Sequence, residues 1–209
     1  MIDAVYCINL DRRPDRWSSF LQQIPRDWDL PEVKRFRAID GRELPRQVAM
    51  TPGTLGCLHT HRKLLSHIVR KNRIVLILED DVIFRPQFCE NLIALLAVVP
   101  DDWEQIYLGG NHRKAPRVAS DGLLRCTYTT ATHAYIVNPR GAEKLLAATD
   151  DYVGHIDQAF GRAHERGEVI AYAPRLWLCG QDDGVSDVMG FNRPARVTAS
   201  YYDWEEALA

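Results

Sequence analysis

The sequence predicts an α/β fold in which a largely parallel central sheet is flanked by helices. Short apolar runs alternate along the chain with longer stretches that carry an apolar stripe at helical spacing. Proline and N-cap residues stand before several of these stretches, and turn residues follow several of the apolar runs. This alternation is typical of a sheet with helices on its faces and function at the carboxyl ends of its strands.

The first half of the chain contains the clearest punctuation. Asp11 ends the first apolar run and Pro14 opens the helix that follows, while Thr51 and Pro52 supply an N-cap and a first helical proline. Asp40-Gly41 is a turn signal. The elements expected here are a strand over 4–10, a helix over 14–23, a strand over 33–39, a helix over 52–71 and a strand over 74–78.

The second half repeats the alternation. Pro86 and Asn138-Pro139 mark helix starts, and Gly167 marks a helix end. The elements expected are a helix over 86–99, a strand over 105–108, a loop over 111–122, a strand over 134–137, a helix from 139, a helix over 156–166 and a strand over 169–172. The polar segment from about 181 is expected to be flexible. Because no repeat or long linker divides the chain, we expect one domain over 1–209.

Composition restricts the class of protein. The 209 residues are 46% apolar with a formal net charge of −2, which gives no overall field toward nucleic acid or an anionic membrane. Five cysteines, odd in number and widely spaced, favour reduced thiols. No basic leader precedes the first strand, and no run of about 18 apolar residues occurs. We expect a cytoplasmic protein without a transmembrane segment.

Three adjacent carboxylates, Glu79, Asp80 and Asp81, follow the apolar run that ends at Leu78. Their mutual repulsion and desolvation predict a neutralising cation, and hard oxygen ligands suit Mg²⁺ or Mn²⁺. In an extended strand end, Glu79 and Asp81 would point to the same side, so that one could hold a ribose and the other the metal. Alternatively, the cluster caps the following helix or pairs with Arg85.

Other polar segments fall near the same predicted strand ends. The arginines that follow Asn9 could grip a diphosphate, or they could be surface residues of a capped helix. Gly53 and Gly56 would let a ligand approach the helix start, but no P-loop or Rossmann glycine pattern is present. Cys57 and His61 are a possible ligand pair, although an isolated pair four residues apart indicates packing more often; His61 could instead contact substrate.

Taken together, these segments resemble glycosyltransferase family 25, which includes enzymes of lipopolysaccharide biosynthesis and relatives of the collagen galactosyltransferases. The resemblance covers about residues 4–187. It rests on Asn9-Leu10-Asp11-Arg12-Arg13-Pro14-Asp15-Arg16, Phe36-Arg37-Ala38-Ile39-Asp40-Gly41, Gly53-Thr54-Leu55-Gly56-Cys57 with His61, Leu78-Glu79-Asp80-Asp81-Val82, Ile106-Tyr107-Leu108-Gly109, Thr132-His133-Ala134-Tyr135 with Gly141-Ala142, and Asp157-Gln158. Thr54 and Thr60 depart from the family's usual acidic residue and serine.

The resemblance implies a GT-A-like, Rossmann-like fold, a UDP-sugar donor, a divalent cation (Mn²⁺ or Mg²⁺) and inversion at the anomeric carbon. Glu79, Asp80 and Asp81 would form the DxD-like element, with Asp81 as the first metal ligand and Asp80 as the second. Asp157 would be the catalytic base, or alternatively a helix cap. Contacts to the nucleotide and donor would come from Asn9, Asp11, Arg12, Arg13, Glu79, Asp80 and His61, and the segment 181–187 would close over the donor.

We therefore expect a metal-dependent inverting transferase that moves galactose or glucose from a UDP-sugar to a hydroxyl acceptor, most simply a glycan. Three alternatives stay open. The acceptor could be a modified nucleic-acid base, contacted by the basic segment 113–117. The carboxylates could serve a metal-dependent nuclease or phosphotransferase. Finally, the chain could be a noncatalytic module that binds a nucleotide sugar.

Overall fold

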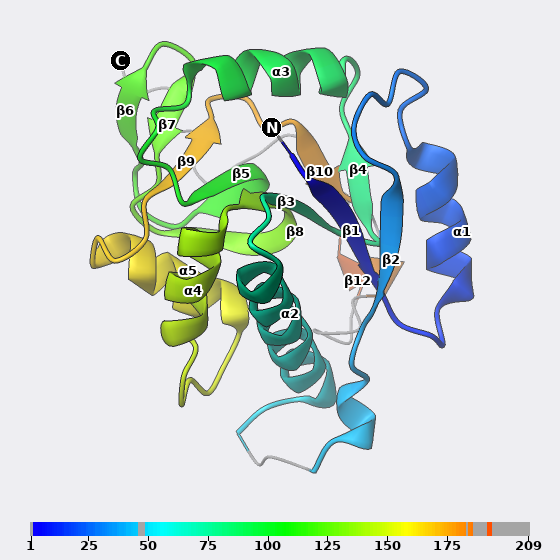
Figure 1. Cartoon of the computed structure of the whole chain (residues 1–209). Helices are drawn as coiled ribbons and strands as arrows, with labels where there is room; N and C mark the ends of the chain where they lie inside the picture. The colour runs from blue at the N-terminus through cyan, green and yellow to red at the C-terminus, as the bar shows by residue number, and fades with distance from the viewer. Residues whose placement is uncertain (1, 46–48, 183, 186–191, 194–209) are drawn as a thin grey trace.

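The computed structural model describes residues 2–45, 49–182, 184–185 and 192–193. An eight-stranded sheet in the order β2-β1-β3-β8-β5-β9-β7-β6 forms its centre (Figure 1). The strands are β1 (Ala4–Asn9), β2 (Val33–Arg37), β3 (Val75–Glu79), β4 (Val82–Phe84), β5 (Gln105–His112), β6 (Arg117–Ser120), β7 (Leu123–Arg125), β8 (Thr129–Val137), β9 (Ala171–Pro174), β10 (Cys179–Gln181), β11 (Gly184–Val185) and β12 (Asn192–Arg193). The helices are α1 (Pro14–Gln23), η1 (Gly41–Glu43), α2 (Pro52–Lys71), α3 (Phe88–Val98), α4 (Pro139–Ala147) and α5 (Ile156–Glu165).

The sheet is mostly parallel, which confirms the expected fold class. Strand β1 pairs in parallel with β2 and β3, and β5 pairs in parallel with β9. Strand β8 lies antiparallel between β3 and β5, and β7 is antiparallel to β9 and β6. Only β7 and β8 therefore run against the other strands of this sheet. The alternation of elements could not reveal this reversal, because periodicity carries no information on strand direction.

Helices cover both faces of the sheet. Leu58, Leu65 and Ile68 of α2 pack with apolar residues of α4 and α5 against one face. Phe20 of α1 and residues of α3, among them Leu92, pack against the other. Figure 1 shows α2, α4 and α5 gathered on one side. Strands buried on both faces read as continuous apolar runs, which explains the composition of β3.

Most helix boundaries agree with the sequence signals. Thr51 caps α2 by accepting a hydrogen bond from the amide of Thr54, and Asn138 caps α4 in the same way. Helix α3 begins two residues later than expected, because Gln87 adopts a left-handed conformation with φ of 60°. Among the described residues, none of the helices combines the length and apolar character needed to cross a bilayer.

The expectation of a loop over 111–122 is wrong in part. Strand β5 continues to His112, and β6 pairs with β7 as a hairpin that extends the sheet edge. The polar, exposed residues of β6 carry too little apolar signal to indicate a strand. The pair is stabilised by its place beside β9, which the local sequence does not show.

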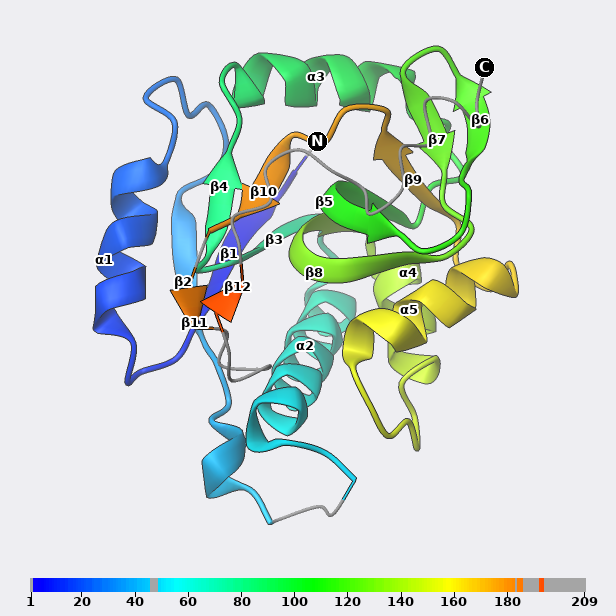
Figure 2. The same cartoon turned by 180° about the vertical axis from the view of Figure 1, so that it is seen from behind.

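The polar residues singled out in the sequence meet where β1 and β3 end. Strand β1 ends at Asn9 and β3 at Glu79, and the antiparallel β8 passes beside the end of β3, where Ala134 pairs with Leu78. After β3 the chain turns at Asp80 and Asp81 into β4, which pairs with β10. Figure 2 shows β4 beside β10, at the side opposite α2. The pairing returns a segment a hundred residues away to the carboxylate turn.

Candidate active site

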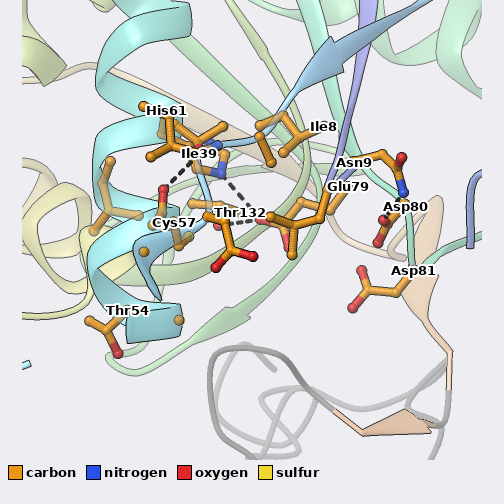
Figure 3. A pocket seen from close by; sticks show the side chains of 18 of the residues that line it. Ile8, Asn9, Ile39, Thr54, Cys57, His61, Glu79, Asp80, Asp81 and Thr132 are labelled. Carbon is orange, nitrogen blue, oxygen red and sulfur yellow. Dashed lines mark hydrogen bonds and ion pairs between the residues drawn. The ribbon is translucent and has the colours of Figure 1, made fainter. Parts of the chain in front are cut away.

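A cleft of about 540 Å³ opens at these strand ends. Its wall is built from the ends of β1 and β3, the start of β8, η1, the first turns of α2, the start of α5 and Gln181 of β10. Figure 3 shows Asn9 and the three carboxylates on one side of the cleft, with Cys57 and His61 of α2 across from them. A cleft of this volume is large enough for a small molecule of nucleotide size.

Asn9 fixes the turn that carries Asp80. Its buried side-chain amide donates to the Asp80 carboxylate at 2.5 Å and to the carbonyl of Arg13 at 2.9 Å. Its oxygen accepts from Arg35 at 2.7 Å. Burial raises the pKa of Asp80, although the bonds from Asn9 and from Arg16, at 3.3 Å, act in the opposite direction. Asn9 is thus a structural bridge between β1 and the carboxylate turn.

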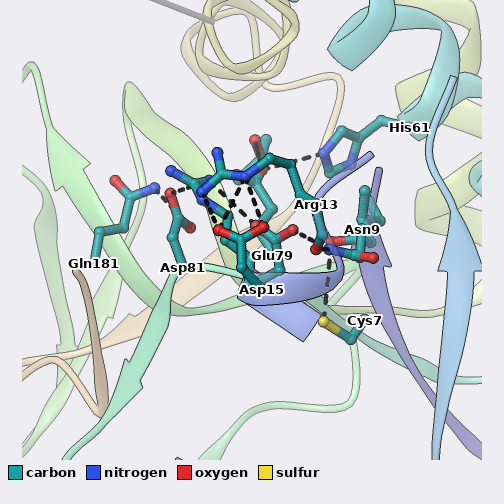
Figure 4. Close-up of polar contacts among 12 residues, drawn as sticks. Cys7, Asn9, Arg13, Asp15, His61, Glu79, Asp81 and Gln181 are labelled. Carbon is teal, nitrogen blue, oxygen red and sulfur yellow. Dashed lines mark hydrogen bonds and ion pairs between the residues drawn. The ribbon is translucent and has the colours of Figure 1, made fainter. Parts of the chain in front are cut away.

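Asp81 is the least compensated member of the carboxylate cluster. Burial, together with the charges of Glu79 and Asp80, raises its pKa to about 7. Its nearest cation is Arg16, at 3.9 Å, and the Gln181 amide lies 3.4 Å from it. Figure 4 shows Gln181 directed at Asp81. The expected alternative partner Arg85 is not the cation that compensates the cluster; Arg16 has that position.

Glu79 is held separately from the other two carboxylates. It accepts from the Thr132 hydroxyl at 2.6 Å and lies 3.3 Å from Nε2 of His61. Burial alone would raise the pKa of Glu79, but its bond to His61, the charge of His61 and the Thr132 hydroxyl outweigh this effect and lower it to about 2. Glu79 and Asp81 line the same cleft, as expected, but not as alternate residues of one strand, because β3 ends at Glu79 and Asp81 lies in the turn.

The arginine segment after β1 is divided between the cleft and the surface. Arg12 lines the cleft and pairs with Asp40 at 2.9 Å, and hydrogen bonds from Arg42 hold the pKa of Asp40 well below its usual range. Asp11 and Arg13 are not among the lining residues. Asp11 pairs with Arg35 and Arg37 of β2. Arg13 pairs with Asp15 at 2.8 Å (Figure 4).

Asp157 lines the cleft from the first turn of α5. Its carboxylate accepts a hydrogen bond from the backbone amide of Ala131 at 3.0 Å. Ala131 has a φ of 72°, a left-handed conformation that is costly for a residue with a Cβ, and it lies where the pairing of β8 with β5 is irregular. The next residue in the chain is Thr132, whose hydroxyl donates a hydrogen bond to Glu79. The carboxylate of Asp157 therefore helps to hold the wall that positions Glu79.

Helix α2 presents Cys57 and His61 to the end of β3. Nδ1 of the buried His61 lies 3.0 Å from the Tyr135 hydroxyl of β8. The sulfur of Cys57, a ring nitrogen of His61 and a carboxylate oxygen of Glu79 all lie within 4.8 Å of one another. Burial, with smaller contributions from nearby carboxylates, raises the pKa of the Cys57 thiol well above its usual value.

Gly53 and Gly56 both line the cleft, as expected, but Gly56 also has a packing role. A Cβ on Gly56 would lie 2.5 Å from the Ile39 carbonyl oxygen and 2.8 Å from the Gly41 amide. The glycine thus allows η1 to pack directly on α2. Thr60, one turn later, also serves this contact, since its hydroxyl accepts from the Ile39 amide at 2.8 Å.

Several cleft residues were not assigned a role of their own by the sequence reasoning. Asp40 and Thr132 were indicated only as members of segments that carry the resemblance, Gln181 only as part of segment 181–187, and Arg16 only as a member of the arginine cluster. The basic residues of segment 113–117 are absent from the lining, and Lys114 pairs with Glu165. In the predicted closing segment 181–187, residues 183, 186 and 187 lie outside the described part of the chain.

Comparison with known proteins gives consistent results. Residues 2–125 match the profile of the family described as "Glycosyltransferase family 25 (LPS biosynthesis protein)". A protein of Drosophila melanogaster named "Glycosyltransferase 25 family member" is 33% identical over 175 residues, which cover 70% of this chain and 28% of that protein. Human "Procollagen galactosyltransferase 2" is 29% identical over 176 residues, with 70% and 28% covered. The chain thus spans little more than a quarter of the length of these relatives.

Among solved structures, UDP-glucose pyrophosphorylase complexed with UDP-glucose aligns with a TM-score of 0.45 and 14% identity. The alignment covers 82% of this chain and 73% of the other. A likeness at this level carries no conclusion about the site.

Proposed function

Since the chain belongs to glycosyltransferase family 25, we propose that its cleft binds a UDP-linked hexose, galactose or glucose, and transfers the sugar to a hydroxyl group of a glycan acceptor with inversion. The observation that carries the proposal is the meeting of the carboxylate turn with Arg12 and Arg16 in one cleft. Arginine forks suit diphosphate oxygens, and carboxylates suit sugar hydroxyls or a cation. The galactosyltransferase named among the relatives supports galactose as the first donor to test.

The residues present fit a divalent cation, Mn²⁺ or Mg²⁺. The turn concentrates two carboxylates beside Glu79, and the pKa of Asp81 is raised by burial and by neighbouring negative charge that Arg16 does not neutralise. We assign Asp81 as the first ligand and Asp80 as the second. When bound, the cation would supply stabilisation of the negative charge that grows on the departing diphosphate.

The chain's own groups have separable roles in this proposal. Arg12, two residues before α1, and Arg16, in the first turn of that helix, bind the diphosphate. Asn9 positions Asp80 for ligand binding, and Glu79, supported by His61, accepts hydrogen bonds from the donor's hydroxyl groups. This arrangement favours Arg16 over Arg13 as a donor contact, because Arg13 is engaged by Asp15 outside the cleft wall.

Asp157 is the proposed base. Inverting displacement requires that a proton leave the acceptor hydroxyl as the new glycosidic bond forms at the anomeric carbon and the bond to the diphosphate breaks. The Asp157 carboxylate would take that proton. Its bond to the Ala131 amide orients the carboxylate, and it lines the same cleft as the carboxylate turn.

We also propose that residues 1–209 act as one domain. The two apolar clusters lie on the two faces of one sheet, and the cleft draws on residues from Ile8 to Gln181. Because the matched stretch makes up 28% of each of these relatives, acceptor choice in a longer protein can depend on other parts of it.

The test is UDP release from a panel of UDP-sugars with Mn²⁺ or Mg²⁺, with and without pooled glycan acceptors. Release from one donor should disappear with EDTA and in Asp81→Ala. Asp102→Asn is a matched control, because Asp102 is half-exposed and bonds to Tyr172 outside the cleft. Donor binding without release would favour a noncatalytic module, and hydrolysis of plain DNA would favour a nuclease. Neither binding nor release from any donor would refute the proposal.

A further inference from the structure

Three different ligand types converge at the inner end of the cleft. Cys57 and His61 lie one turn apart on α2 and face Glu79 at the end of β3. Their sulfur, nitrogen and oxygen atoms lie within 4.8 Å of one another. Figure 3 shows His61 directed at Glu79, with Cys57 one turn nearer the N-terminus of α2. Only one of the three residues is acidic, so the group is not simply a cluster of carboxylates.

The separation of two of these atoms matches a tetrahedral metal site. Zn²⁺ lies about 2.1 Å from nitrogen and oxygen ligands, which places two such ligands about 3.4 Å apart at a tetrahedral angle. Nε2 of His61 and Oε1 of Glu79 are 3.3 Å apart. A sulfur ligand requires about 3.6 Å to the other two atoms. The Cys57 sulfur lies within 4.8 Å of both atoms, so it would have to move by little more than about 1 Å to reach that distance.

The surrounding groups are those that orient metal ligands. Metal-bound histidines generally use their other ring nitrogen in a hydrogen bond, and ligating carboxylates are themselves hydrogen-bonded. Here Tyr135 lies 3.0 Å from Nδ1 of His61, and Thr132 donates to Glu79. The two tautomers of His61 suit the empty site and the metal-bound site respectively. Nε2–H donates to Glu79 when the Tyr135 hydroxyl donates to Nδ1; when Nδ1–H donates to Tyr135, the lone pair on Nε2 faces Glu79 and is available to a metal.

We propose that Cys57, His61 and Glu79 form a binding site for Zn²⁺, or for another divalent ion that prefers thiolate and imidazole, with a fourth position open to the cleft. On binding, the Cys57 S–H bond breaks, a proton leaves to solvent and the sulfur bonds to the metal. The thiolate and the carboxylate balance the two charges of the ion. The site differs from the Asp80 and Asp81 pair, whose hard oxygen ligands suit Mg²⁺ and Mn²⁺.

One consequence rests on the proposed function. Glu79 cannot bind Zn²⁺ and remain fully available to the donor, so occupation of this site should weaken donor binding. Zinc would then inhibit the transferase reversibly.

The direct test is titration of the full chain with Co²⁺ as a spectroscopic substitute for zinc. We expect thiolate-to-cobalt charge-transfer absorption in the near ultraviolet, and its loss on addition of Zn²⁺. Cys57→Ser should remove the band. It should also lower Zn²⁺ affinity, measured by competition with a chromophoric chelator, by at least the ~10- to 100-fold that loss of an outer hydrogen-bond partner costs.

Two further variants keep the test decisive. Cys89→Ser removes a buried thiol of α3 from the opposite apolar cluster and should leave the band unchanged. Tyr135→Phe should keep the band but weaken zinc binding about tenfold, which would show the role of Nδ1 if Cys57→Ser folds poorly. A missing band in the wild type, or a band that persists in folded Cys57→Ser, would overturn the proposal. Donor binding with Mg²⁺ in zinc-free buffer tests the proposed function independently.

Discussion

Replacing Asp157 by Asn and by Ala separates its proposed chemistry from its support of the cleft wall. Asp157→Ala removes the acceptor for the Ala131 amide. An unsatisfied buried donor costs about 1–3 kcal/mol, and we expect about 1 kcal/mol because Ala131 is only half-buried. Asp157→Asn keeps an oxygen acceptor at the same position and should lose less than about half of that amount. Both variants should lose UDP release that depends on acceptor, because neither side chain can take a proton.

Urea unfolding followed by tryptophan fluorescence measures the stability, and UDP release measures the chemistry. Ala131→Gly provides the matched control, since glycine adopts a φ of 72° without the cost that alanine bears, about 1 kcal/mol. This substitution should recover part of the stability of Asp157→Ala but none of its activity. If Asp157→Asn transferred sugar at the wild-type rate, Asp157 would not be the base. If Asp157→Asn were as unstable as Asp157→Ala, the hydrogen bond to Ala131 would not explain the stability lost in Asp157→Ala.

Three further predictions follow from individual contacts. The pKa of Asp81 is about 7 in the fold against an ordinary 3.8, so between these values the metal-free fold holds a proton that the unfolded chain has lost. The thermal midpoint in EDTA should therefore fall as pH rises from about 4 to 7. Asp81→Asn should flatten this pH dependence. Glu104→Ala should lower the free energy of unfolding in urea by about 2 kcal/mol, because buried Glu104 accepts from the Ile170 amide and from two cations of α4. Thr132→Val should weaken donor binding by calorimetry about tenfold by releasing Glu79, whereas Thr132→Ser should not.

Local signals in the sequence were sufficient for much of the fold. The apolar run before Glu79 predicts β3, and Thr51-Pro52 and Asn138-Pro139 predict the starts of α2 and α4. These signals succeed because capping and strand burial depend on neighbours in the chain. The reversal of β8 and the β6–β7 hairpin depend on partners elsewhere in the sheet, so the sequence could not indicate them.

The candidate site shows the same division. The carboxylate cluster could be identified because three adjacent acidic residues follow an apolar strand. Asn9, Arg12, His61 and Asp157 could be identified only from the resemblance to a family. Sequence could not show that Glu79 turns toward α2, because its partners lie 18 and 53 residues away. For the same reason, an i,i+4 pair such as Cys57 and His61 indicated packing until the fold brought a third ligand beside it.

The pairing of β4 with β10 has a consequence for how the protein is made. Asp81 leaves the ribosome long before Gln181, its partner from 100 positions later, and the backbone bond between Asp182 and Asp81 must wait as long. Until then, β4 is a strand with an open edge next to a repulsive acidic turn. The cleft can therefore assemble only after translation has passed β10. Nascent chains stalled before that point should expose the unpaired edge of β4 and should therefore bind chaperones more than the complete chain does.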